Sequence, residues 1–282
     1  MVRRAFGLGV GAAAVVTLLA GCDGDRAFAG FGWPSGITPQ ASRMYDLWIG
    51  SVVAALAVGF FVWGLIFWCI IKYRKKTDEL PPQTRYNLPI EVIYTVVPFL
   101  VIAVLFYYTA VIQTDVNKQS ANPDVTVEVV SFQWNWQFNY KEGASDDGSS
   151  PTLFSELGTS DYIPVLVLPT NRTVRIEQTS RDVVHSFWVP DLLFKRDQFP
   201  DPTARNSFEI TINQEGAYVG RCAELCGTYH SMMNFELRAV SPEEYEQFVA
   251  ERRAGKSTPE ALTAIGEEPY ATKTKPFPTK RI

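Results

Sequence analysis

Two apolar runs limit what this chain can fold into more than any other feature of its sequence. They extend from Leu47 to Ile71 and from Leu88 to Ile112, and each is long enough to cross a bilayer as a helix. The segment between them is rich in basic side chains, so the positive-inside rule places it in the cytoplasm. We therefore expect a transmembrane hairpin over residues 45–113 with both ends outside the membrane. The basic residues are Lys72, Arg74, Lys75, Lys76 and Arg85.

The N-terminus has the features of a secretory signal. Arg3 and Arg4 precede a small apolar run that ends in "LLAGC", which is too short to span a bilayer comfortably. The ending resembles the lipobox of bacterial lipoproteins, which implies cleavage after residue 21 and lipidation of Cys22. The alternative is an uncleaved apolar helix. On the first reading, residues 22–44 form an extracytoplasmic segment.

The periodicity changes after the second apolar run. Short stretches such as "VTVEVVSFQWNWQFNY" and "HSFWVP" alternate, are rich in β-branched and aromatic residues, and end at turn-forming residues. They predict an all-β sandwich or Greek-key barrel over residues 120–252, interrupted by an acidic insert at 141–161. Ser241, Pro242 and Glu244 predict a capped helix, and we expect residues 253–282 to form a flexible tail. The formal net charge of −4 argues against a nucleic-acid binder.

The stretch "CAELCGTYHSMM", from Cys222 to Met233, concentrates metal-binding side chains. The chain has only four cysteines and two histidines, yet Cys222, Cys226 and His230 lie together here, and His185 begins "HSFWVP". A disulfide is one interpretation, and a structural zinc site is another. Thiolate, imidazole and a weak thioether are instead the ligands of electron-transfer copper. Because there are two cysteines, two thiolates could bridge two copper ions.

The pattern C-A-E-L-C-G-T-Y-H-S-M-M, with H-S-F-W-V-P and W-N-W upstream and two preceding apolar helices, closely resembles subunit II of cytochrome c oxidase in the haem-copper superfamily. The resemblance covers residues from about Trp48 to Phe248. It implies a cupredoxin fold with a binuclear CuA copper centre on the outer face of a bacterial plasma membrane. It also implies transfer of electrons from cytochrome c to haem in subunit I, where oxygen reduction is coupled to proton pumping. The partners would be subunits I and III, with the haems and the second copper in subunit I.

The resemblance also assigns roles to single residues. Glu224 would give its backbone carbonyl to one copper, and its carboxylate to a magnesium or manganese ion shared with subunit I. Met232 lies one residue away from the motif position and is read as a packing residue. The copper ligands would be His185, Cys222, Glu224, Cys226, His230 and Met233.

Three further residues have both an ordinary and a functional interpretation. Trp134 on a strand is usually a packing residue, but the resemblance makes it the exposed aromatic through which electrons reach CuA. Asp182 would ordinarily be an unremarkable surface carboxylate, but its position matches an acidic residue that docks the electron donor. Glu91 is either an interfacial carboxylate that snorkels or the glutamate at the mouth of the K proton pathway.

Two other functions compete with the electron-accepting subunit of an oxidase. One is subunit II of a quinol oxidase, a homologue that has lost copper, and the other is a membrane-tethered copper carrier. The sequence has no C-x-x-C-H motif for a c-type haem, so the electron donor must be another protein. The lipobox and the acidic insert resemble actinobacterial members of the family, whose donor is a dihaem cytochrome c of a bc complex. That resemblance implies a supercomplex.

Overall fold

The computed structural model describes residues 30–143, 150–201 and 203–274. The chain divides into two compact units, one formed by Arg43–Asp115 and the other by the segments that precede and follow it. The predicted signal at 1–21 and the predicted lipidation site Cys22 lie outside the described residues.

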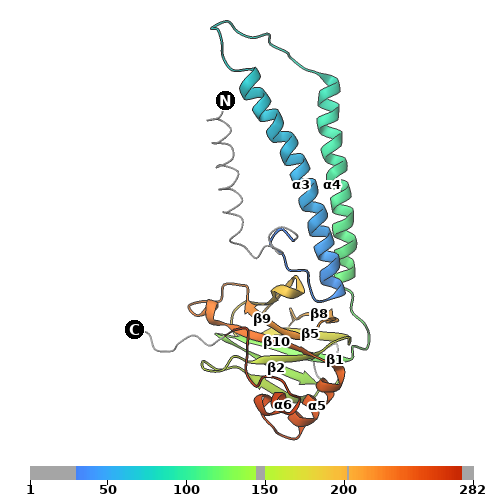
Figure 1. Cartoon of the computed structure of the whole chain (residues 1–282), viewed down its shortest axis with the longest axis vertical. Coiled ribbons are helices and arrows are strands. Elements are labelled where there is room, and N and C mark those ends of the chain that lie inside the picture. The colour runs from blue at the N-terminus through green and yellow to red at the C-terminus, as the bar shows by residue number, and fades with distance from the viewer. Residues whose placement is uncertain (1–29, 144–149, 202, 275–282) are drawn as a thin grey trace, which may run out of the picture. The chain divides into compact units, whose positions relative to one another are not determined.

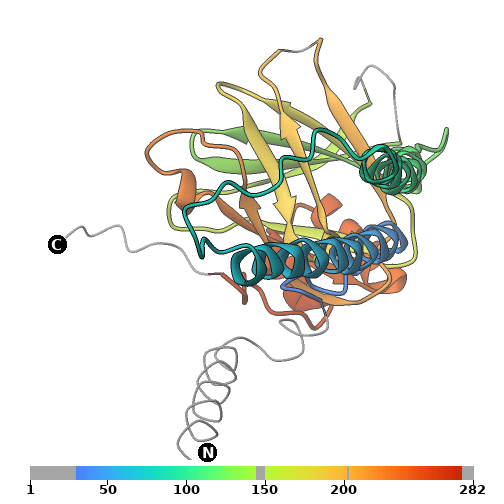
Figure 2. The ribbon, with the colours of Figure 1, turned by 90° about the horizontal axis from the view of Figure 1, so that it is seen from above.

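The first unit is a pair of long apolar helices, α3 (Pro39–Lys72) and α4 (Leu88–Val116). Both are long and apolar enough to cross a membrane, and at 1.5 Å per residue even α4 extends about 43 Å, more than a hydrocarbon core of about 30 Å. Their apolar side chains face outward, with Phe60 75% exposed, as expected of helices made for lipid or a membrane partner. An Arg43–Asp115 ion pair joins the start of α3 to the end of α4, and the helices diverge from there (Figures 1 and 2).

The helices begin and end outside the predicted bounds of 45–113. The Thr38 hydroxyl accepts a hydrogen bond of 3.0 Å from the Ala41 backbone N–H, which caps the first turn of α3 and lets the helix start ahead of its apolar run. At the other end of the pair, α4 continues through polar residues to Val116.

Among the described residues, the second unit contains ten strands in two five-stranded sheets. The sheet orders are β3-β2-β1-β5-β8 and β4-β10-β9-β6-β7. Pairs β1·β5 and β4·β10 are parallel, and the other neighbouring pairs are antiparallel. The strands are β1 Val125–Phe132, β2 Asn135–Lys141, β3 Thr152–Leu157, β4 Val165–Pro169, β5 Val174–Ser180, β6 His185–Val189, β7 Phe194–Gln198, β8 Asn206–Ile210, β9 Gly216–Cys222 and β10 Asn234–Val240.

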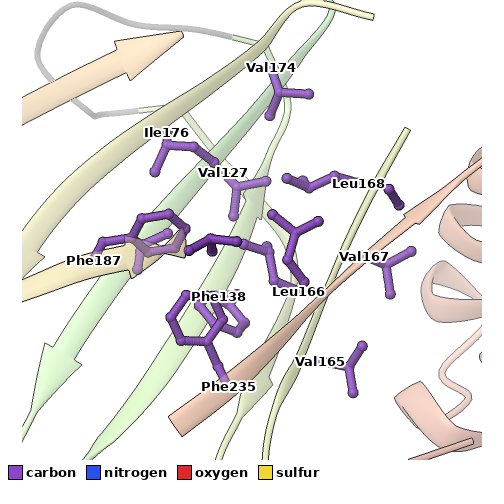
Figure 3. Packing of buried hydrophobic residues seen from close by; sticks show 14 of the residues in the cluster. Val127, Phe138, Val165, Leu166, Val167, Leu168, Val174, Ile176, Phe187 and Phe235 are labelled. Atoms are coloured by element: carbon purple, nitrogen blue, oxygen red, sulfur yellow. The ribbon is translucent and has the colours of Figure 1, made fainter. Parts of the chain in front are cut away.

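The two sheets pack against each other through aromatic side chains. Trp136 and Phe138 of β2 point inward from alternate positions, as a strand with one buried face requires, and their rings lie 5.1 and 5.5 Å from that of Phe235 on β10. Figure 3 shows Phe138 and Phe235 side by side among other buried side chains of the core. A Cβ atom at Gly220 would lie 2.2 Å from the Phe235 ring, so this position requires glycine. Cys222 and Cys226 belong to the same buried cluster, so the candidate site is continuous with the core.

The C-terminal region differs from the prediction. Helix α5 (Pro242–Arg253) has the predicted capping box at Ser241. The expected flexible tail, however, contains a second capped helix, α6 (Thr258–Ala264), whose Ala261 and Leu262 are fully buried. The prediction was wrong here because it overlooked a second capping box, formed by Ser257 and Glu260. After α6 the chain returns to β10, where the buried Glu236 carboxylate accepts the Thr272 and Lys273 backbone N–H groups at 2.6 and 2.8 Å.

The predicted acidic insert at 141–161 is also only partly a loop. Residues 152–157 form β3, which pairs with β2 and extends the first sheet. The acidic part at 144–149 lies outside the described residues.

Candidate metal centre

Two strand ends bring the predicted ligands together. His185 is the first residue of β6 and Cys222 is the last residue of β9, and these antiparallel neighbours are in register at Phe187 and Cys222. The loop after Cys222 then carries Cys226, passes through a short 3₁₀ turn at His230–Met232, and returns to the sheet at β10. Sheet pairing therefore positions the upstream histidine beside a motif 37 residues further along the chain.

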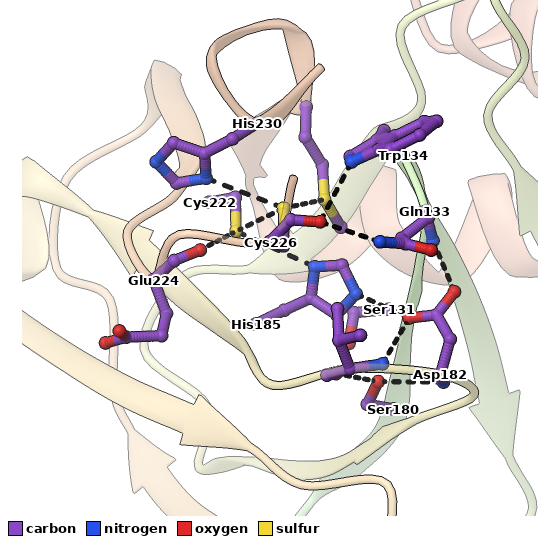
Figure 4. A network of polar contacts seen from close by, with 12 residues as sticks. Ser131, Gln133, Trp134, Ser180, Asp182, His185, Cys222, Glu224, Cys226 and His230 are labelled. Carbon is purple, nitrogen blue, oxygen red and sulfur yellow. Dashed lines mark hydrogen bonds and ion pairs between the residues drawn. The ribbon is translucent and has the colours of Figure 1, made fainter. Parts of the chain in front are cut away.

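The other four predicted ligands converge on the two cysteine sulfurs, and Figure 4 shows the two histidines on either side of them. The Sγ atoms of Cys222 and Cys226 lie 3.8 Å apart. His185 Nδ1 lies 3.8 Å from Cys222 Sγ, and His230 Nδ1 lies 3.5 Å from Cys226 Sγ. Met233 Sδ is 4.0 Å from Cys226 Sγ, and the Glu224 carbonyl oxygen is 3.3 Å from Cys222 Sγ.

These distances separate the three interpretations of the cluster. A disulfide needs sulfurs about 2.05 Å apart, and both cysteines are free thiols. Structural zinc takes four ligands, whereas six donor groups converge here. Because 3.8 Å is less than twice a metal–thiolate bond of about 2.3 Å, one ion can contact both sulfurs. The donor set therefore fits two ions that share the two thiolates, each completed by its own imidazole.

The two thiols differ in acidity. Burial would raise the pKa of Cys222, but hydrogen bonds from His185 and from the surrounding backbone outweigh it and lower the pKa to about 7. Burial and the neighbouring charge of Cys222 raise the pKa of Cys226 to about 12. The thiolate is the form that binds metal. A bound cation would remove the repulsion that keeps Cys226 protonated.

Asp182 holds the His185 ring in place. Asp182 Oδ1 lies 2.8 Å from His185 Nε2 and accepts the Val183 backbone N–H, while Oδ2 accepts the Gln133 backbone N–H at 2.7 Å. Although burial opposes it, these hydrogen bonds lower the pKa of Asp182. The pKa of His185 is raised, because its contacts with Cys222 and Asp182 outweigh burial. This arrangement leaves His185 Nδ1 facing the sulfurs, a positioning role that the sequence did not indicate.

Trp134 lies directly on the loop that carries Cys226 and His230. Its indole N–H donates to the Cys226 carbonyl oxygen at 3.1 Å, and its ring meets Tyr229 edge to face at 4.9 Å between centroids. The side chain of Gln133 donates to the same carbonyl at 2.8 Å. Gln133 and Tyr229 were missed in the sequence, where the one local signal is that each adjoins a predicted functional residue or motif.

The remaining predicted residues lie in different surroundings. The Glu224 side chain is 44% exposed, with a carboxylate oxygen 3.4 Å from Lys195 Nζ. Met233 is buried but Met232 is 38% exposed, so Met232 is not the packing residue that was expected. Glu91 lies in the helical unit near the start of α4, where its Oε1 accepts the Asn87 backbone N–H at 2.9 Å and caps the helix.

Comparison with known proteins gives concordant matches. The family described as cytochrome C oxidase subunit II, periplasmic domain, matches residues 125–240, and the corresponding transmembrane domain matches residues 27–111. A Nocardia farcinica protein named "Probable cytochrome c oxidase subunit 2" is 47% identical over 100% of this chain and 89% of its own length. Cytochrome c oxidase subunit 2 of Mycobacterium tuberculosis is 44% identical over 95% of this chain and 87% of its own. The crystal structure of the periplasmic domain of subunit II from Bradyrhizobium japonicum is 27% identical, with a TM-score of 0.40, over 50% of this chain and 98% of that one.

Proposed function

Because this chain belongs to the cytochrome c oxidase subunit II family, and is thus part of an oxidase, we propose that it is the subunit that receives electrons from cytochrome c. It takes them at a binuclear CuA centre and passes them to haem in subunit I, where oxygen is reduced and protons are pumped. The observation that carries this proposal is the convergence of four donor groups on two buried, unbonded cysteine sulfurs, which makes six donors in all.

Each of the predicted ligands would have a distinct role in binding copper. Cys222 and Cys226 would bridge the two ions, His185 and His230 would bind from either side, and Met233 would add a weak thioether. The Glu224 carbonyl would complete the set. When bound, the two coppers supply a one-electron centre whose charge is shared over two metals and two sulfurs.

The protein around the centre keeps it rigid. His185 and Met233 are almost fully buried, and both cysteines are buried within the sandwich core. A close-packed interior lets side chains move little when the charge of the centre changes. Such rigidity suits electron transfer, because little of the driving force is then spent on rearrangement.

Two surfaces would connect the centre to its partners. On one side, Trp134 touches the loop and offers an aromatic contact to the donor. The Glu224 carboxylate would bind the magnesium or manganese ion shared with subunit I, in which case the ion would replace its present Lys195 partner.

The apolar helices α3 and α4 would pack against subunits I and III in a bacterial plasma membrane. Lipidated Cys22 would add a second anchor, and a dihaem cytochrome c of a bc complex is the proposed donor.

The alternative functions fit the site less well. A quinol-oxidase subunit without copper has no use for the converged donors, and two buried free thiols would then be a liability in an oxidising compartment. A copper carrier must release its metal, whereas six converged donor groups, four of them on the buried residues His185, Cys222, Cys226 and Met233, favour retention.

A spectroscopic experiment tests the proposal. The oxidase purified with this subunit should show a copper-dependent near-infrared band and hyperfine structure from two equivalent copper ions. Both should disappear in Cys222→Ser, whereas Cys69→Ser, which changes a cysteine of α3, serves as the matched control and should retain them. A wild-type enzyme with the spectrum of a single copper, or none, would reject a binuclear centre.

A further inference from the structure

The turn between β1 and β2 consists of Gln133 and Trp134, and it is attached to the metal-binding loop. Strand β1 ends at Phe132 and β2 begins at Asn135. Both turn residues donate a side-chain N–H to the Cys226 carbonyl oxygen, Gln133 Nε2 at 2.8 Å and Trp134 Nε1 at 3.1 Å. One carbonyl oxygen with two lone pairs is therefore held from two directions, and it belongs to one of the two cysteines that converge at the site.

The same turn is also bonded to the other metal-binding segment. The Gln133 backbone N–H donates to Asp182 Oδ2 at 2.7 Å, and Asp182 Oδ1 contacts His185 Nε2 at 2.8 Å. Gln133 thus connects to Cys226 through its side chain and to His185 through its backbone, as Figure 4 shows.

The loop has no side chain at Gly227, where the turn approaches it. Gly227, which follows the clamped carbonyl, has a φ of +116°, which few other residues adopt. A Cβ atom there would lie 3.2 Å from Trp134 Cζ2 and 3.3 Å from Gln133 Nε2. The glycine therefore lets the turn approach the loop backbone closely enough for both hydrogen bonds to form.

We propose that Gln133 is a positioning residue, whose side-chain amide holds the Cys226 carbonyl so that the Trp134 indole and the Cys226 thiolate keep one fixed arrangement. This inference rests on the proposed electron-transfer function and adds a residue to it. Removing the amide leaves the carbonyl with the indole N–H as partner, so the fold and the copper should survive. What is lost is the second constraint on the contact between Trp134 and the loop.

The test is Gln133→Met in the assembled oxidase, because methionine keeps the length of the side chain but has no N–H donor. We expect the copper content and near-infrared spectrum of the wild type. The rate of CuA reduction within the donor complex should fall about five-fold, which corresponds to about 1 kcal/mol for one lost hydrogen bond. The dissociation constant for the donor and its salt dependence should not change.

Gln137→Met is the matched control. Gln137 lies on β2, where its side chain bonds Asn139 and Arg181 rather than the metal loop, so the same chemical change there should leave the rate of CuA reduction unaltered. Gln133→Glu provides a second variant of the same length that cannot donate as a carboxylate, and its rate should fall at least as much. If Gln133→Met does not assemble, the rate of CuA reduction in Gln133→Glu tests the proposal instead.

Each outcome separates this inference from the function on which it rests. A wild-type rate in either Gln133 variant would overturn the positioning role while leaving the CuA assignment intact. Loss of copper from Gln133→Met would also overturn it, because Gln133 would then be required to form the centre. A wild-type enzyme that lacks the near-infrared band would instead reject the proposed function itself.

Discussion

Replacing Asp182 by asparagine should lower the affinity for copper more than it lowers the affinity for the electron donor. Three N–H groups, from His185, Val183 and Gln133, converge on the Asp182 carboxylate. Asparagine offers one oxygen and one NH₂ group in place of two oxygens. If its oxygen faces His185, its NH₂ group faces the Gln133 N–H. In the reverse orientation the NH₂ group faces His185 Nε2, so at least one hydrogen bond is lost either way.

The size of the effect follows from the contact that is lost. A hydrogen bond to a charged group contributes about 1.5–3 kcal/mol, and the lower end applies because the Asp182 side chain is 30% exposed. Outer partners of metal-binding histidines typically change metal affinity by about 10- to 100-fold when removed. We expect a loss of copper affinity near the lower value, about ten-fold, together with a shift in the CuA midpoint potential.

The assay follows copper and docking separately in the assembled oxidase. Copper retention is measured against a chelator of graded concentration, and donor association is measured at low and high ionic strength. Asp161→Asn is the matched control, because Asp161 is exposed and removing it changes the net charge equally. Interactions between exposed charges are screened beyond about 10 Å at 0.1 M salt, so a docking carboxylate must show its effect chiefly at low salt.

The reasoning would be refuted by one clear pattern. The pattern is that Asp182→Asn keeps wild-type copper retention and midpoint potential but weakens donor association at low salt well beyond Asp161→Asn. The Asp182 carboxylate would then be a docking group, as the family resemblance implies, and its contact with His185 would not affect function.

Three further variants test the remaining assignments. Trp134→Ala should bind the donor with unchanged salt dependence but reduce CuA much more slowly in rapid-mixing experiments; a normal rate would make Trp134 a packing residue. Met233→Leu should lower the free energy of unfolding by less than about 1.5 kcal/mol. It should keep both coppers but shift the midpoint potential, because a thioether tunes potential more than affinity. Loss of all copper, as in Cys222→Ser, would contradict this. Glu91→Gln keeps the acceptor for the Asn87 N–H but cannot carry a proton, so turnover should slow with CuA reduction unchanged; unaltered turnover would leave Glu91 as a helix cap.

The fold class and the family were predictable because their signals are local or compositional. An apolar run of 25 residues has few solutions other than a membrane helix, and both expected helices are present. The family resemblance of the motif is confirmed by full-length relatives. The capping box at Ser241 needs only residues within four positions of one another. Helix α6 has the same local signal in the capping box of Ser257 and Glu260, which the prediction overlooked, whereas its burial depends on a surface formed elsewhere in the chain.

The sequence by itself determined which atoms are available to hold metal, because the kinds and spacing of side chains from Cys222 to Met233 are written in one short stretch. Only the tertiary structure decided what surrounds them. The contacts of Gln133 and Trp134 with the Cys226 carbonyl join residues 93 and 92 positions apart, and the orientation of Asp182 toward His185 depends on a neighbouring turn. Such contacts are set by sheet register and by the close approach of the Gln133 and Trp134 side chains to the backbone at Gly227. Neither can be predicted from a local pattern, because each depends on how distant strands pair.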